Sequence, residues 1–216
     1  MNIFLNKLEK WLHKWRLDMN PKKCQYIVFG KGTKNPVHLK LKLFQDFIPK
    51  VNSIKFLGIT LDYQMNFNEC INEVISKFNG RINIIKILSN KSWCLNNDTL
   101  KCIYFSLIRS IIEYNSIIYP LISESNKKRI RAIQYNALRI SFRKPIKTKN
   151  EEILQLSHAT KLDDRLEHLN KRYFINCLKY NNELIKDIIL KFKNWYTINR
   201  ECKYKTILCH YKRIFE

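Results

Sequence analysis

The sequence predicts an α+β protein that is mostly helical, in which a small antiparallel sheet is followed by a helical bundle. Three observations lead to this fold class. Apolar and polar residues alternate over residues 37–43, as they do in a half-buried strand. After residue 62 the apolar residues recur every three or four positions, which is the period of one helix face. A chain of 216 residues that is 45% hydrophobic and 12% aromatic also has enough apolar side chains to fill a core.

The amino-terminal part is predicted to hold one helix and three strands. Leucine and aromatic side chains at helical spacing predict a helix over 3–19. It should end at the Asn-Pro pair that follows, because a residue before proline avoids the α region. The predicted strands are 26–29, 37–43 and 54–61. The last of them contains Gly58, which suggests a bulge or a close approach of another backbone.

The remainder of the chain is predicted to be helical. The apolar pattern indicates helices at 71–88, 99–119, about 126–142, 154–169 and 173–192. The second is apolar nearly all round and should be buried. Asn97 or Asp98 can cap its start, and Pro120 should end it. Ser125 or Asn126 can cap the third helix.

Charge and cysteine usage narrow the class of partner and the compartment. The chain has 40 Lys and Arg against 18 Asp and Glu, a formal net charge of +22. A/T-rich coding favours lysine and explains part of this excess, but its size still makes nucleic acid the first expected partner, ahead of a membrane. Seven cysteines without a CxxC pair, and no secretory signal, indicate the nucleus or cytoplasm rather than secretion. The most apolar window, 103–122, contains Arg109 and Glu113, so we expect a buried helix there and no membrane span.

The predicted helix near 126–142 carries the strongest signal for nucleic-acid binding. Residues 126–150 include nine Lys or Arg and no acid. On a helical wheel one face collects cations and an aromatic side chain: Lys128, Arg131, Tyr135, Arg139 and Arg143. The opposite face is apolar, so one side can pack while the other binds a phosphate backbone. The alternative is a solvated basic face that has no partner.

Four stretches of sequence together resemble one family. They are WRLDMNPKKC at 15–24, VNSIKFLGITLD at 51–62, IYFSLIRSIIEYNS at 103–116 and IRAIQYNALRI at 130–140. In their order and spacing they resemble the reverse transcriptases of non-LTR retrotransposons of the jockey-like, LINE type. The chain departs from that pattern at Ser110 and Asn115, where the family usually has Pro and Gly, and at Cys70, where it often has His.

The resemblance implies a palm-edge and thumb fragment with three parts. These are a partial palm with a primer-grip hairpin at 1–62, a thumb-like helical region at 63–192 and a basic tail at 193–216. It implies that Lys23 is the palm lysine that approaches nucleotide phosphates; the alternative is an exposed lysine in a turn. It also implies that Phe56, Leu57 and Gly58 form the primer grip, where a glycine lets the backbone approach the primer strand. The alternative for Phe56 and Leu57 is ordinary packing of a strand.

The family's polymerase chemistry requires two divalent metals held by aspartates. In this family those aspartates lie before the helix that opens the present chain, so we assign no catalytic and no metal-binding residue here. Asp163 and Asp164 form the one Asp-Asp pair, and we interpret it as a charge pair at a helix start.

We therefore expect an amino-terminally truncated RNA-directed DNA polymerase that is inactive alone. Its parent family uses Mg²⁺, and we expect this fragment to bind no cofactor and no small-molecule substrate. The expected partners are an RNA template and a DNA primer. Two alternatives remain open: a small basic helical protein that binds nucleic acid as its own function, and a decaying reading frame with no selected role.

Overall fold

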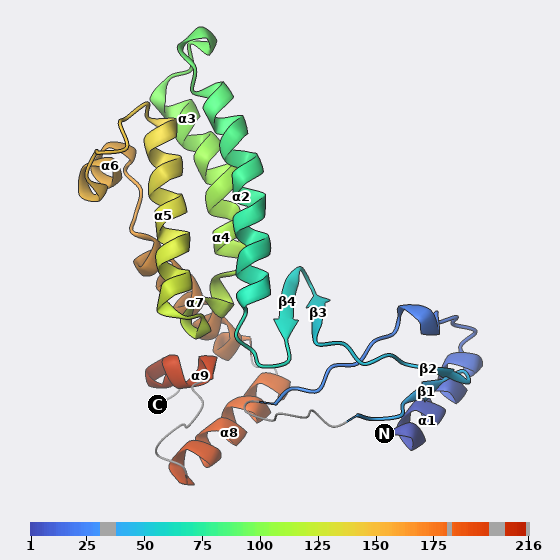
Figure 1. Cartoon of the computed structure of the whole chain (residues 1–216). Helices are drawn as coiled ribbons and strands as arrows, with labels where there is room; N and C mark the ends of the chain where they lie inside the picture. The colour runs from blue at the N-terminus through green and yellow to red at the C-terminus, as the bar shows by residue number, and fades with distance from the viewer. Residues whose placement is uncertain (31–37, 181–182, 199–205, 215–216) are drawn as a thin grey trace. The chain divides into compact units, whose positions relative to one another are not determined.

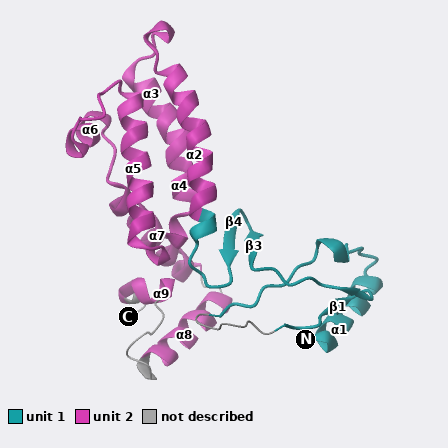
Figure 2. Ribbon diagram, viewed as in Figure 1, with its two compact units in different colours: residues 1–70 teal, residues 71–216 magenta. Residues whose placement is uncertain are grey.

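The computed structural model describes residues 1–30, 38–180, 183–198 and 206–214. The chain divides into two compact units, residues 1–70 and 71–216 (Figure 2). Short antiparallel hairpins occur in the first unit, and helices make up nearly all of the second (Figure 1). The predicted class, a mostly helical α+β protein, is confirmed. The division into functional parts at residues 62 and 192 stays a prediction.

The first helix is shorter than predicted. α1 covers Asn2–Lys14 and does not reach residue 19. Arg16 adopts a left-handed conformation with φ 52°, and the N–H of Leu17 donates to the carbonyl of Leu12 at 3.0 Å. These two features make a Schellman motif, which ends a helix by satisfying its last carbonyls. The Asn-Pro pair that we expected to end α1 instead begins a separate 3₁₀ turn, η1 (Pro21–Lys23).

Two separate hairpins replace the single sheet that the sequence suggested. β1 (Lys42–Leu43) pairs with β2 (Asp46–Phe47), and β3 (Ser53–Phe56) pairs with β4 (Ile59–Asp62), both antiparallel. The predicted continuous strand at 54–61 was wrong, because its middle is a two-residue turn. Leu57 and Gly58 both have positive φ, 46° and 81°, as a type I′ hairpin turn requires.

The strand predicted at 26–29 is reduced to one bridge, and the strand predicted at 37–43 to its last two residues. Tyr26 bridges Lys50, and among residues 27–29 the structure has no strand. The Tyr26 hydroxyl donates to the carbonyl of Leu39 at 2.6 Å and accepts from the N–H of Leu39 at 3.0 Å. A side chain thus satisfies backbone groups that we had expected to join a ladder. Residue 37 lies outside the described residues.

The second unit contains most of the helices. They are α2 (Asn68–Leu88, which begins in the first unit), α3 (Asn97–Tyr104), α4 (Ser110–Tyr114), α5 (Glu124–Ser141), α6 (Asn150–Ser157), α7 (Leu162–Lys179), α8 (Glu183–Ile198) and α9 (Ile207–His210). The helix predicted at 71–88 is confirmed by α2. The helices predicted at 154–169 and 173–192 had wrong boundaries: His158 is left-handed and ends α6, so α7 starts afresh at residue 162.

The helix predicted at 99–119 is interrupted. A π-helical turn, η3 (Phe105–Arg109), separates α3 from α4, and the guanidinium of Arg81 donates to the carbonyl of Leu107 in that turn at 2.8 Å. The α conformation ends at Tyr114, well before the predicted stop at Pro120. Pro120 lies inside a 3₁₀ segment, η4 (Ser116–Leu121), instead of ending the helix.

Both predicted caps were misplaced. Asn96 caps α3, with its side-chain oxygen accepting from the N–H of Thr99 at 2.8 Å. Ser123 caps α5, with its hydroxyl accepting from the N–H of Asn126 at 3.3 Å. Each cap residue has the extended backbone that this position needs, and the residues that we expected to cap are already helical.

Two apolar clusters hold the helices of the second unit together. Among the described residues, side chains of α2, α3, α5 and α6 are fully buried, including Phe78, Ile85, Leu100, Leu138 and Ile153, and they contribute to the first of these. A second cluster joins α7, α8 and α9 through Phe174, Ile189 and Tyr211. Burial of aliphatic and aromatic side chains of this kind is the main stabilising contribution to a helical unit.

Candidate nucleic-acid interface

The turn of the β3–β4 hairpin exposes an aromatic and an aliphatic side chain. Phe56 is 62% exposed, and Leu57 and Gly58 are exposed beside it. The structure thus brings the three predicted primer-grip residues together at one tight turn. Positive φ at the turn is easy for Gly58, because it has no Cβ.

Asp62 fixes the base of this hairpin, a role that the sequence analysis missed. One carboxylate oxygen accepts from the N–H groups of Gln64 and Asn66, at 3.1 and 3.0 Å, and the other accepts from the N–H of Phe67 at 2.6 Å. Phe67 itself is buried. The signal was present in the Leu-Asp pair that closes the motif, since aspartate readily accepts hydrogen bonds from backbone two residues on.

Lys23 is exposed in the 3₁₀ turn η1. The oxygen of Asn20 caps this turn by accepting from the N–H of Lys22 at 3.0 Å. The approach of Lys23 to nucleotide phosphates stays a prediction.

The arginines predicted to form the basic face of α5 contact other parts of the same unit. Arg139 donates to the carbonyl of Thr148, at 3.0 and 2.8 Å, and to the side-chain oxygen of Asn150 at 2.6 Å. Arg143 donates to the carbonyls of Ser89 and Leu95, at 2.6 and 3.1 Å. These guanidinium groups therefore hold the ends of loops in place.

Arg131 is also paired. It forms ion pairs with Glu124 and, at 3.7 Å, with Asp163. The hydroxyl of Tyr119 donates to the same Asp163 at 2.7 Å. Burial, the larger cause, and this hydrogen bond both raise the pKa of Tyr119 far above its usual value. Asp163 lies in the first turn of α7. Of the predicted basic face, Lys128 and Arg143 are exposed. Tyr135 is half-buried, with the Arg139 guanidinium 6.0 Å from its ring centre.

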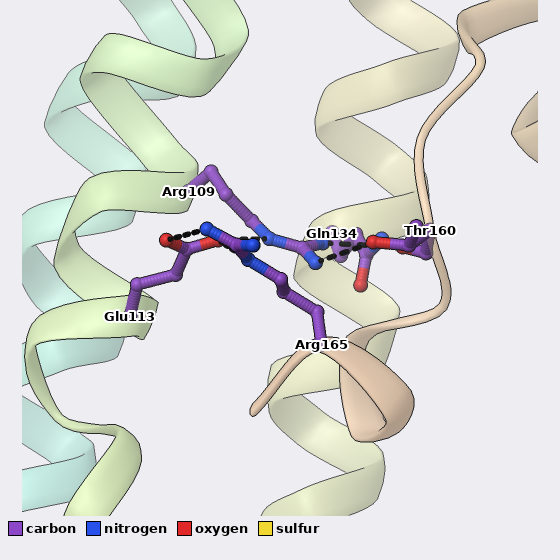
Figure 3. Close-up of polar contacts among 5 residues, drawn as sticks. All are labelled: Arg109, Glu113, Gln134, Thr160 and Arg165. Atoms are coloured by element: carbon purple, nitrogen blue, oxygen red, sulfur yellow. Dashed lines mark hydrogen bonds and ion pairs between the residues drawn. The ribbon is translucent and has the colours of Figure 1, made fainter. Parts of the chain in front are cut away.

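A polar network in the second unit was not predicted from the sequence (Figure 3). Arg109 is buried; its Nε donates to Glu113 at 3.1 Å, and its Nη atoms lie 3.4 and 3.3 Å from the carbonyl and hydroxyl of Thr160. Arg165 binds both oxygens of Glu113, at 2.9 and 3.2 Å, and the Gln134 amide donates to the Thr160 carbonyl at 3.5 Å. The spacing of Arg109 and Glu113, four residues apart in a predicted helix, was the available signal.

Electrostatics in this network favour the charged form of Glu113. Burial alone would raise the pKa of this carboxyl group. The hydrogen bonds and charges of Arg165 and Arg109 outweigh that effect, so the pKa of Glu113 lies below its ordinary value. One carboxylate thus links η3 and α4 to α7.

Among the described residues, no group of three or more His, Cys, Asp or Glu side chains is placed to hold a metal ion. In the same part of the chain, no helix is both long and apolar enough to cross a membrane.

Comparison of the amino-acid sequence with known proteins finds similarity to one group of polymerases. The RNA-directed DNA polymerase from the mobile element jockey of Drosophila melanogaster is 24% identical over 191 residues, which is 86% of this chain and 20% of that relative. The chain resembles the RNA-directed DNA polymerases of jockey-type mobile elements. The probable RNA-directed DNA polymerase from transposon BS of the same organism is 26% identical over 136 residues, 63% of this chain and 15% of that relative. The expected resemblance is confirmed.

This jockey-like chain spans about a fifth of the length of the first curated relative that it matches. No family model and no solved structure matches it. The predicted site residues of the jockey-like chain fall in both units: Lys23, Phe56, Leu57 and Gly58 in the first, and Lys128, Arg131, Tyr135, Arg139 and Arg143 in the second.

Proposed function

We propose that this chain is a nucleic-acid-binding part of a retrotransposon RNA-directed DNA polymerase, and that its partners are an RNA template and a DNA primer. The observation that carries the proposal is the alignment of 86% of the chain with the jockey polymerase. The formal net charge of +22 supports it, because a strongly cationic surface attracts phosphate backbones.

The β3–β4 hairpin is the proposed contact with the primer strand. Its turn presents Phe56 and Leu57 to solvent, and the backbone at Gly58 has no Cβ to keep a sugar–phosphate chain away. Asp62 holds the base of the hairpin through three backbone N–H groups. A hairpin that is anchored at its base suits a positioning role, because less conformational entropy is lost when it binds.

On the predicted basic face, we assign the contact with phosphates to the exposed Lys128 rather than to the three arginines, which are engaged within the unit. Arg131, Arg139 and Arg143 already bind carboxylates and carbonyls of the same unit. They support the shape of the basic surface, and the Arg139 guanidinium lies 6.0 Å from the ring centre of the half-buried Tyr135.

We further propose that these 216 residues by themselves bind a template–primer but do not extend it. Two-metal polymerisation needs carboxylates that are available to the ions. Here Asp163 is held by Tyr119 and Arg131, and Asp62 accepts three backbone N–H groups. The parent polymerase would use Mg²⁺ through other carboxylates.

Two measurements on the purified chain test this function. Filter binding to an oligo(dT)-primed poly(rA) across a range of salt should give an affinity that falls steeply with salt, as several phosphate contacts require. Addition of dTTP and Mg²⁺ should give no incorporation above a protein-free control. An affinity independent of salt would contradict the binding role, and incorporation would contradict the proposed inactivity.

A further inference from the structure

One end of the helical bundle combines two segments that lie far apart in the sequence. The turn between α2 and α3, residues 89–96, meets the segment that follows α5, residues 143–149, at the upper end of the bundle in Figure 1. Arg143 joins them, donating to the carbonyls of Ser89 and Leu95 at 2.6 and 3.1 Å. We call residues 89–96 and 143–149 the bundle tip.

The bundle tip is strongly cationic. It contains five basic residues and no Asp or Glu: Lys91, Arg143, Lys144, Lys147 and Lys149. All five are exposed. Like charges gathered at one end of a bundle repel one another, so an anionic partner stabilises this arrangement more than water does.

The bundle tip also contains an exposed indole. Trp93 is 56% exposed at the end of the 3₁₀ turn η2 (Lys91–Trp93). The turn is well defined: the Asn90 side chain accepts from the N–H of Ser92 at 3.1 Å, and Cys94 is left-handed with φ 49°. All four tryptophans of the chain are at least 41% exposed, so exposure alone does not single out Trp93. What distinguishes it is its place on a fixed turn within the cationic bundle tip, where its flat apolar face suits a partner with a flat apolar face of its own.

We propose that the bundle tip binds a single-stranded stretch of nucleic acid, with one base stacked on Trp93 and phosphates beside Lys91 and Lys144. Aromatic side chains stack unpaired bases of any sequence, while lysines follow the backbone. In a duplex the bases are already stacked on each other and unavailable, which makes a single strand the better fit. The proposal rests on the proposed function, because it adds a contact to a chain that binds nucleic acid.

The test uses the full 216-residue chain and two fluorescent probes, a short oligo(dU) and a blunt duplex of equal length, with affinity measured by anisotropy. Trp93→Ala should weaken binding to the single strand by about tenfold, since one stacked base contributes about 1–3 kcal/mol. Trp93→Phe should retain most of the affinity. Binding of the duplex should be unchanged in both variants.

A matched control is available in the first unit. Trp15 is 61% exposed, so Trp15→Ala removes a similar area of indole from outside residues 89–96 and 143–149, and it should leave oligo(dU) affinity unchanged. Lys91→Ala combined with Lys144→Ala should lower the log–log salt slope by about 1.4, at about 0.7 for each phosphate contact on a single strand. Melting temperatures of all variants should match that of the unaltered chain, because the changed side chains are exposed.

The outcomes separate this proposal from the function on which it rests. If the unaltered chain binds neither probe, both are overturned. If it binds and Trp93→Ala binds oligo(dU) as tightly as the unaltered chain, the bundle tip proposal alone is overturned. An equal loss on the duplex, or an equal loss in Trp15→Ala, also overturns it, because neither result is compatible with base stacking at Trp93.

Discussion

At the scale of single residues, a cationic side chain serves different purposes according to what lies near it. Arg109 is buried and bound to Glu113, whereas Lys128 is exposed on α5. A buried guanidinium needs a full set of acceptors, because the loss of one partner leaves an uncompensated charge in a poorly solvated place.

The buried network gives a prediction about stability. Glu113→Gln should lower the free energy of unfolding by about 1–3 kcal/mol at neutral pH, because Arg109 and Arg165 lose the charge of their shared acceptor. Urea denaturation followed by circular dichroism measures this. Glu124→Gln is the matched control: Glu124 pairs with Arg131 at the surface, where an ion pair contributes about 0–1 kcal/mol. Equal effects of the two substitutions would contradict the structural importance of the network.

The effect of Glu113→Gln on the free energy of unfolding should depend on pH, because the pKa of Glu113 is lowered in the folded chain. Since the folded-state pKa lies below the ordinary value of 4.5, the unfolded chain binds this proton more readily than the folded chain. The stabilisation is therefore complete well above pH 4.5 and is lost as the pH falls through the folded-state pKa. The stability difference between the unaltered chain and Glu113→Gln should shrink over that acid range. A difference that grows on acidification would show that the pKa is raised.

The hairpin turn gives a prediction about binding. Phe56→Ala together with Leu57→Ala should weaken binding of primed poly(rA) several-fold, because the apolar tip that contacts the primer is removed, and should leave melting unchanged. Phe47→Ala is a close control, since Phe47 is 63% exposed and lies in the other hairpin of the same unit. If Phe47→Ala weakens binding as much, the effect comes from general loss of apolar surface and not from the proposed primer contact.

At the scale of elements, two glycines show how the backbone conformation decides whether substitution by alanine stabilises or destabilises the fold. Gly80 lies within α2, and a Cβ added there would meet no atom within 4 Å. Gly80→Ala should raise the free energy of unfolding by about 0.5–1 kcal/mol, because glycine is a poor helix former. Thermal melting measures the change, and a lowered melting temperature would argue against the described course of α2.

Gly58 lies in the β3–β4 turn with φ 81°, and there the same substitution should have the opposite sign. An L residue in the left-handed region is disfavoured by about 1–2 kcal/mol, so Gly58→Ala should destabilise the hairpin. Hydrogen exchange of the hairpin amides should become faster while exchange in the helices of the second unit stays the same. Unchanged protection would contradict the turn geometry.

At the scale of the whole molecule, hydrophobic periodicity predicted the class and most helices because it is a local property. The pattern over 71–88 needs no knowledge of partners, and α2 appears where it indicates. Helix ends were less predictable. The left-handed conformation of Arg16 ends α1 earlier than the apolar pattern indicates. The π turn at Phe105–Arg109 contacts a donor from another helix, Arg81.

What the sequence by itself determined is the mostly helical α+β class, the cationic character and the resemblance to jockey-type polymerases, since each is carried by residue identity and spacing. What only the tertiary structure decided is which cations are already engaged by acceptors of the same unit. A helical wheel places Arg131, Arg139 and Arg143 on one face of the predicted helix, but α5 ends at Ser141 and two acceptors of Arg143 lie 54 and 48 residues away along the chain. Guanidinium groups bind the nearest available acceptors, and distance in space, unlike spacing in sequence, exists only once the chain has folded.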